Sequence, residues 1–305
     1  MPAPSEWSLD APRKLTFENP VTTLHVRLVG GTVNVVGSDS GPARLELSAI
    51  EGPPLTVTHD GGDLTVTYDD LTWKYFLKWF TPTGGRRNAH VTLTVPTSTR
   101  VEVGVVEAGA VVSGVSGRTD VRGVSGDTTL VGLTGEVRAD TVSGRLEAQA
   151  LTGDLRFNSV NGDLTLIESG SGAVKAESVS GDMVVDLSPG AKSTRIDLTT
   201  VSGEVAIRLP HAADAEVEAN TASGALSNAF DDLRVSSQWG AKRVTGQLGA
   251  GSGKLKVTTV SGSVALLRRP RSEAGADDTA DDAADAADTA DAGDTAANAT
   301  ERKDL

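Results

Sequence analysis

The glycine-rich stretch 249–254 reads Gly-Ala-Gly-Ser-Gly-Lys and is a candidate phosphate-binding loop. Consecutive backbone N–H groups in such a loop can surround an anion. A Walker sequence would also need glycine at the position of Leu248, and serine or threonine at the position of Leu255. A turn between two strands explains the same glycines, so the pattern does not predict nucleotide binding.

The spacing of the histidines and serines gives little support for catalytic or metal chemistry. None of the four histidines has zinc-ligand spacing to another, so we interpret them as surface or hydrogen-bonded side chains. No serine lies in a Gly-x-Ser-x-Gly motif, and the absence of cysteine excludes disulfides and thiolate chemistry. The histidines are His25, His59, His90 and His211.

Acidic residues follow several regularly spaced glycines, and stacked carboxylates could bind Ca²⁺. Calcium-binding β-rolls read Gly-Gly-x-Gly-x-Asp, a motif that this chain lacks, and Arg145 interrupts the row. We interpret the row as solvated charges at turns and predict no metal and no other cofactor. The row consists of Asp127, Glu136, Asp154, Asp163, Asp182 and Glu204.

An aromatic and basic segment, Leu71–Phe80, is the best candidate interaction site. It holds five of the chain's eleven aromatic residues, and it is amphipathic whether it is read as a helix or as a strand. It could dock on a partner groove or an anionic membrane surface, or it could cap the apolar end of a repeat structure. We favour the cap, because repeat structures need capping. The candidate residues are Trp73, Lys74, Tyr75, Phe76, Lys78, Trp79 and Phe80.

A repeat runs through the centre of the chain, and its strands must position the candidate residues. Its glycines recur at every ninth position, and the second and fourth positions after each glycine are mostly apolar, as at Val137 and Ala139. The intervening positions are mostly polar, which is the alternation of a half-buried strand. We expect Ser-Gly and Thr-Gly corners in which glycine takes positive φ. The glycines are Gly117, Gly126, Gly135, Gly144, Gly153 and Gly162, followed by Gly172 and Gly181.

The corners alternate between Val-Ser-Gly or Val-Asn-Gly and Leu-Thr-Gly, which predicts coils of about 18 residues with two unlike halves. After Gly181 the glycines at 203, 224 and 246 predict coils of about 22 residues. The fold class is therefore all-β, a single-stranded β-helix (β-solenoid) stabilised by stacking of neighbouring coils. The irregular N-terminal part contains the alternating segments Leu24–Val29, Thr32–Val36, Ala43–Leu47, Leu55–Val57, Leu64–Tyr68 and Val91–Val95.

The predicted organisation is a flexible N-terminus (1–14), one continuous β-solenoid domain (15–268) and a disordered acidic tail (269–305). Within the domain, 15–106 form an irregular cap region and 107–268 the regular repeats. Residues 272–305 carry eleven acidic and two basic side chains, −9 of the chain's net −13. The tail has no large apolar residue to offset the entropy of ordering between 274 and 299. The charge disfavours nucleic-acid binding.

The Val-Ser-Gly-Asp/Glu corners at 124–127, 179–182 and 201–204 and the closing Val-Ser-Gly-Ser at 260–263 carry a family resemblance. The chain resembles the bacterial β-strand-repeat proteins of the putative-adhesin family, a domain of unknown function, over roughly residues 15–268. The resemblance implies a β-solenoid and defines no catalytic residues.

The first twenty residues show no apolar leader, and no apolar run approaches about 18 residues, so we expect a cytoplasmic protein.

The most specific function that the sequence predicts is a non-catalytic scaffold or binding module with an unidentified protein partner. One alternative is bactofilin-like self-assembly, and another is peripheral membrane or partner docking through Leu71–Phe80. A carbohydrate-active enzyme is disfavoured, because Phe157 is the sole aromatic residue between Gly117 and Gly190 and is expected to point inward.

Overall fold

The computed structural model of the chain describes residues 5–68, 86–170, 172–191 and 195–270. These residues form twenty-four β-strands and no helix, so the predicted all-β class is confirmed. The strands are β1 (Ser5–Leu9), β2 (Arg13–Phe17), β3 (Thr23–Leu28), β4 (Gly30–Ser38), β5 (Ala43–Glu51), β6 (Leu55–Asp60), β7 (Asp63–Thr67), β8 (Asn88–Pro96), β9 (Arg100–Val105), β10 (Gly109–Ser113), β11 (Thr119–Gly123), β12 (Thr128–Val131), β13 (Val137–Gln149), β14 (Leu155–Ser169), β15 (Val174–Ser178), β16 (Met183–Leu187), β17 (Arg195–Thr200), β18 (Val205–Leu209), β19 (Ala215–Thr221), β20 (Leu226–Asn228), β21 (Leu233–Gln238), β22 (Ala241–Leu248), β23 (Gly253–Thr259) and β24 (Val264–Arg268).

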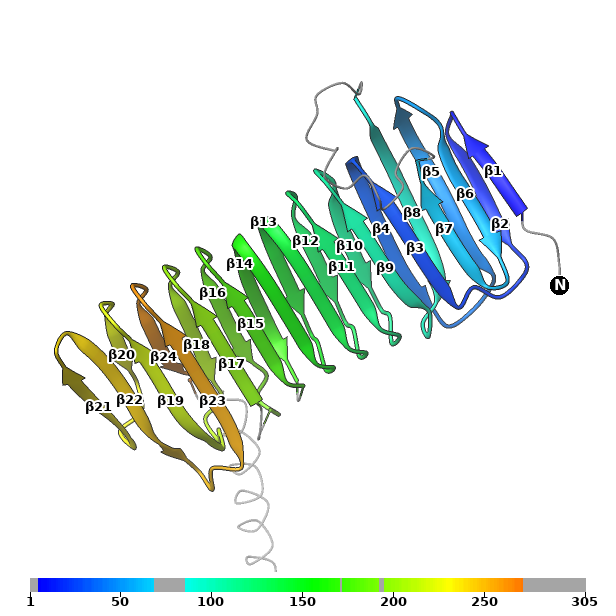
Figure 1. Cartoon of the computed structure of the whole chain (residues 1–305). Coiled ribbons are helices and arrows are strands. Elements are labelled where there is room, and N and C mark those ends of the chain that lie inside the picture. Colours follow the sequence, from blue (N-terminus) through cyan, green and yellow to red (C-terminus); the bar gives the residue numbers. More distant parts are fainter. Residues whose placement is uncertain (1–4, 69–85, 171, 192–194, 271–305) are drawn as a thin grey trace, which may run out of the picture. The chain divides into compact units, whose positions relative to one another are not determined.

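The strands belong to one open sheet whose pairings form two rows (Figure 1). Row A has the order β1-β6-β7-β3-β9-β11-β13-β14-β15-β17-β23-β19-β22-β21. Row B has the order β2-β5-β8-β4-β10-β12-β13-β14-β16-β18-β24-β20. The long strands β13 and β14 bend from one row into the other and join them. The chain divides into two compact units, Met1–Arg269 and Pro270–Leu305, and every strand belongs to the first.

Parallel pairing in the middle of each row follows the repeat. Val137 of β13 pairs with Leu155 of β14, and Met183 of β16 pairs with Val205 of β18, which is one predicted coil later in each case. This register places equivalent positions directly above one another, so the two predicted apolar columns lie in the core, where Phe157 is fully buried. One continuous cluster of buried side chains from both rows forms that core.

The corner glycines are required by close approach of the backbone. A Cβ at Gly162 would lie 2.6 Å from the oxygen of Gly144, and one at Gly181 would lie 1.9 Å from the oxygen of Gly162. Positive φ occurs at Gly126 and Gly144 but not at Gly162 or Gly181. The expectation of positive φ at every corner is therefore wrong, because the stacked carbonyl groups alone leave no space for a side chain.

The last two strands are inserted into the stack. Strands β23 and β24 lie between the pair β17 and β18 on one side and the pair β19 and β20 on the other. The stacking of corners is therefore Gly203, Gly262, Gly224. The predicted corner at Gly246 is wrong: this glycine lies within β22, opposite Val217, because β22 runs antiparallel to β19.

The N-terminal end is closed in the same way, with β3 and β4 lying between the β7/β8 and the β9/β10 pairs. Antiparallel strands follow outside them, and β1 pairs with β6. The expected flexible N-terminus (1–14) is therefore wrong for residues 5–14. The strand is held because Leu9 is buried and the Trp7 ring packs edge-on against Phe17, with centroids 5.6 Å apart.

Candidate functional site

The predicted interaction segment lies outside the described residues. This applies to Trp73, Lys74, Tyr75, Phe76, Lys78, Trp79 and Phe80. The predicted acidic tail lies outside them as well, apart from residues 269 and 270. The hollow and the polar contacts described below lie among the described strands.

The glycine-rich stretch 249–254 already surrounds an anion from its own chain. The Asp214 carboxylate accepts hydrogen bonds from the Ser252 backbone N–H at 3.0 Å and from the Ser252 hydroxyl at 2.6 Å. The Ser252 hydroxyl, the Ser252 amide and the amides of Gly251 and Ala250 hold the pKa of Asp214 below its usual value. The N–H and hydroxyl groups of the loop that could bind an external anion therefore bind Asp214 instead, which is a structural contact.

The acidic row at the corners also has a structural use. The Asp163 carboxylate accepts the Asp182 backbone N–H at 3.0 Å, and the Asp182 carboxylate accepts the Glu204 backbone N–H at 2.8 Å. These side chains join successive layers of the stack, so the interpretation as merely solvated charges was incomplete. Within the described ranges no group of three or more His, Asp or Glu side chains is arranged to hold a metal ion.

A hollow of about 250 Å³ opens on the outer face of row A, across β3, β9, β11 and β13. It exists because Gly104 of β9 takes an outward position between Arg27 of β3 and Arg122 of β11 in the pairing register. Two long side chains thus flank a position that has none. The walls are mainly apolar, and Val124 and Val142 are among the residues that line them.

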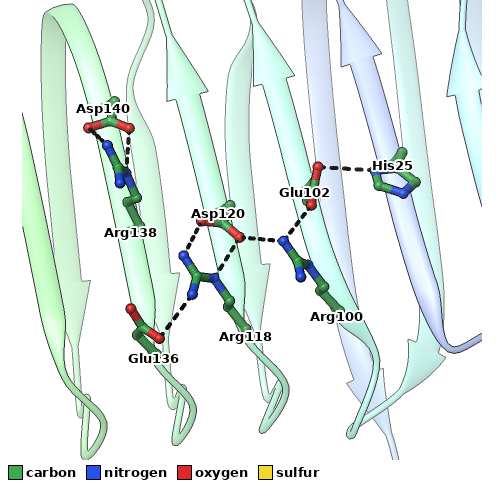
Figure 2. A network of polar contacts seen from close by, with 8 residues as sticks. All are labelled: His25, Arg100, Glu102, Arg118, Asp120, Glu136, Arg138 and Asp140. Carbon is green, nitrogen blue, oxygen red and sulfur yellow. Dashed lines mark hydrogen bonds and ion pairs between the residues drawn. The ribbon is translucent and has the colours of Figure 1, made fainter.

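Ion pairs border the hollow, as one chain of contacts from His25 to Glu136 and a separate pair, Arg138 and Asp140 (Figure 2). Glu102 lies 3.2 Å from His25 Nδ1 and 2.8 Å from Arg100 Nη2. Asp120, whose side chain is 7% exposed, lies 2.9 Å from Arg118 Nε and 3.5 Å from Arg100 Nη2. The carboxylates at this rim are therefore neutralised by neighbouring cations.

Asp140 completes the rim on β13. Its carboxylate lies 2.8 Å from Arg138 Nε and accepts a hydrogen bond from Asn158 Nδ2 at 2.6 Å. Burial opposes ionisation of Asp140, but the hydrogen bonds from Arg138 and Asn158 and the charge of Arg122 outweigh it and hold the pKa of this carboxyl below its usual value. A carboxylate with a lowered pKa is a poor general acid at neutral pH.

The sequence reasoning did not identify Gly104, Arg27 or Arg122 as site residues. An isolated glycine inside the alternating run Val101–Val105 was an available signal, since glycine within a strand often marks a place where a ligand or backbone approaches closely. The two arginines could not be assigned to it, because Arg27 lies far from its pairing partner Gly104 in the sequence.

An all-β repeat protein with one face hollowed between stacked strands is the class that the fold and the site define. The chain belongs to the Toastrack DUF4097 family, whose model matches residues 32–267. The family resemblance predicted from the corner motifs is thereby confirmed.

A comparison with curated proteins found no match. Among solved structures, the chain is similar to a putative cell adhesion protein from Clostridium sporogenes, at 11% identity and a TM-score of 0.30, covering 85% of this chain and 100% of that one. It is similar to a putative adhesin from Bacteroides fragilis, at 11% identity and a TM-score of 0.45, covering 85% and 98%. It is also similar to a putative lipid binding protein from Parabacteroides distasonis, at 9% identity and a TM-score of 0.37, covering 86% and 98%. The described part of the chain contains no helix long and apolar enough to cross a membrane.

Proposed function

We propose that the protein is a non-catalytic binding scaffold that takes an aromatic side chain of a protein partner into the hollow over Gly104. The observation that carries the proposal is the notch between Arg27 and Arg122. Neighbouring strands are about 4.8 Å apart, so these two residues start about 9.6 Å apart. This spacing admits one planar ring between two guanidinium groups, each of which can interact with a ring face.

The size of the hollow supports the same ligand class. A cavity of about 150 Å³ can hold a benzene ring, and the hollow measures about 250 Å³, with mainly apolar walls. The carboxylates of its rim are engaged with arginines, which suits them to shaping a surface rather than to acid–base chemistry.

We also propose that the described strands form a single-stranded β-helix with coils of roughly 18–22 residues. Support comes from the parallel pairing of Leu146 with Leu164 and of Val174 with Ile196, since the members of each pair are one such coil apart in the sequence. In such a stack each layer contacts only its neighbours, which leaves a flat outer face free for binding.

Docking of Leu71–Phe80 on a membrane or partner remains a separate proposal, supported by its aromatic and lysine content. Liposome flotation of the wild type against Trp73→Ala/Trp79→Ala tests it. Unchanged flotation of the double variant would exclude the membrane form of this proposal.

The hollow is tested with N-acetyl-tryptophanamide as the probe, by NMR titration of the full chain. Gly104→Leu fills the notch, and its Cβ would meet the nearest atom, Cγ of Arg27, at 3.7 Å, an ordinary van der Waals contact, so we expect the variant to fold. Gly109→Leu is the matched control, since its nearest contact is 3.8 Å and it lies outside the hollow. We expect shifts at Gly104 and Val124 that Gly104→Leu abolishes and Gly109→Leu keeps. Absence of shifts at millimolar probe would contradict the proposal.

A further inference from the structure

Trp239 differs from the other large hydrophobic residues that the structure describes because it is 97% exposed. It occupies the two-residue turn between β21 and β22, where Gln238 pairs with Ala241. Its φ is 54° and that of Gly240 is 87°, the signature of a type I′ turn. Asparagine followed by glycine is the favoured pair in this turn, and a bulky residue with positive φ is strained.

The turn thus holds a residue that is unfavourable both for local conformation and for solvation. Where a sequence breaks a local rule without a structural gain, a functional contact is the expected reason. The ring of Trp239 has no described packing partner that would explain its choice over asparagine. Its position at the tip of a hairpin makes it a convex feature suited to a concave site.

The hollow over Gly104 is such a concave site, and it suits an aromatic ring. The two features cannot meet within one molecule, because β13 at the hollow and β21 are separated in row A by β14, β15, β17, β23, β19 and β22 (Figure 1). Seven strand spacings of about 4.8 Å place them roughly 34 Å apart. A contact between them must join two molecules.

We propose that Trp239 of one molecule inserts into the hollow over Gly104 of a second copy, between Arg27 and Arg122. This inference rests on the proposed function, since it names the aromatic side chain that the hollow receives. The contact uses different surfaces on the two copies, so it is heterologous and repeats head to tail unless a ring closes.

Charge is not the main source of this contact. The β21–β22 hairpin carries Arg234, Lys242 and Arg243 and no acidic residue. The hollow presents charges of both signs, with Arg27 and Arg122 beside Glu102, Asp120 and Asp140 in its lining. Association should therefore weaken by less than about tenfold between 50 and 500 mM NaCl. Binding to an anionic bilayer would depend more strongly on salt, because each basic residue contributes about 1 kcal/mol to it, which is roughly fivefold in affinity.

Sedimentation velocity of the full chain up to roughly millimolar concentration tests the proposal. The wild type and Trp239→Phe should associate. Trp239→Asn and Gly104→Leu should associate at least tenfold more weakly and so remain monomeric at the concentrations where the wild type assembles. Trp239→Asn keeps the hairpin folded because asparagine suits the turn, and Gly109→Leu controls for an added side chain elsewhere. N-acetyl-tryptophanamide should dissociate the wild-type assembly.

Mixing the two monomeric variants gives the decisive result. Gly104→Leu keeps Trp239, and Trp239→Asn keeps the hollow, so an equimolar mixture should form a 1:1 dimer that cannot extend. A mixture that stays monomeric, a monomeric wild type, or association that survives Gly104→Leu would each overturn the inference. If the small probe still binds the hollow in those cases, the proposed function stands and the identity of the occupant is wrong.

Discussion

Replacement of Asp186 by asparagine should loosen the inserted last strand of the stack. Asp186 lies on β16 and its side chain is 7% exposed. Its Oδ1 accepts a hydrogen bond from Arg208 Nε at 2.8 Å, and both of its oxygens lie 2.8 Å from Arg269 Nη2. Arg208 belongs to β18 and Arg269 follows β24, so one carboxylate joins three successive layers of row B.

The size of the effect follows from these contacts. A hydrogen bond to a charged group contributes about 1.5–3 kcal/mol. The Arg208 side chain is 47% exposed and solvent screens its share, whereas that of Arg269 is 22% exposed. We expect Asp186→Asn to lower the free energy of unfolding by about 2–3 kcal/mol, or the Tm by about 5–10 °C.

The pH dependence provides a second readout. Hydrogen bonding from Arg208 is the main cause that holds the pKa of Asp186 below its usual value; burial opposes it and Arg269 reinforces it. A carboxyl whose folded pKa lies below its unfolded pKa contributes its full stability above the unfolded value, near 3.9, and loses it as pH falls through the folded value. The stability gap between wild type and variant should be constant from pH 7 to about 5 and shrink below about pH 4.

Urea unfolding followed by circular dichroism measures the gap, and hydrogen exchange locates it. Amides of β24 should exchange faster in Asp186→Asn, while those of β11 should not. Asp140→Asn is the matched control, because the Asp140 side chain is 29% exposed against 7% for Asp186 and its ion pair with Arg138 lies within one strand, so its effect should stay within about 1 kcal/mol. Two results would refute the reasoning. One is a free energy of unfolding of Asp186→Asn within about 0.5 kcal/mol of wild type, which is the range of an ordinary surface substitution. The other is a stability gap that does not shrink in acid.

Three further predictions concern the stack itself. A Cβ at Gly203 would lie 1.8 Å from a backbone oxygen of the neighbouring layer. Gly203→Ala should therefore lower the free energy of unfolding in urea by about 3 kcal/mol or more, whereas Gly104→Ala should change it by no more than about 0.5 kcal/mol. Equal effects would contradict the close-approach argument. Phe157 is fully buried, so Phe157→Ala should cost about 3–5 kcal/mol by calorimetry. Asp182→Ala removes the acceptor of the Glu204 N–H and should cost about 1 kcal/mol, with faster exchange of that amide as the check.

The sequence predicted the layers well because their signals are local. The close backbone approaches at the stacked corners need glycine, and most inward positions hold apolar residues, so the period of nine appears directly in the residues. The N-terminal strands were predicted near their observed places for the same reason. For example, the expected segment Ala43–Leu47 falls within β5.

The order of stacking was not predictable in this way. The corner at 260–263 has the same local pattern as earlier corners, and nothing in it specifies insertion between Gly203 and Gly224. That order is set by the return of the chain through the β21–β22 hairpin. The hollow escaped for a similar reason, because its three central residues, Arg27, Gly104 and Arg122, meet only through the register of β3, β9 and β11.

The doubled-back ends give this chain a definite order of completion during synthesis. Layers in the middle can dock as each one leaves the ribosome, because each pairs with strands already made. The pair β19 and β20 cannot join the stack until β23 and β24 have emerged, because β23 lies between β17 and β19, and β24 lies between β18 and β20. A chain that stops before residue 253 is therefore not a shorter version of the protein. It is one with an unpaired strand edge at β17 and β18, the kind of edge that promotes aggregation.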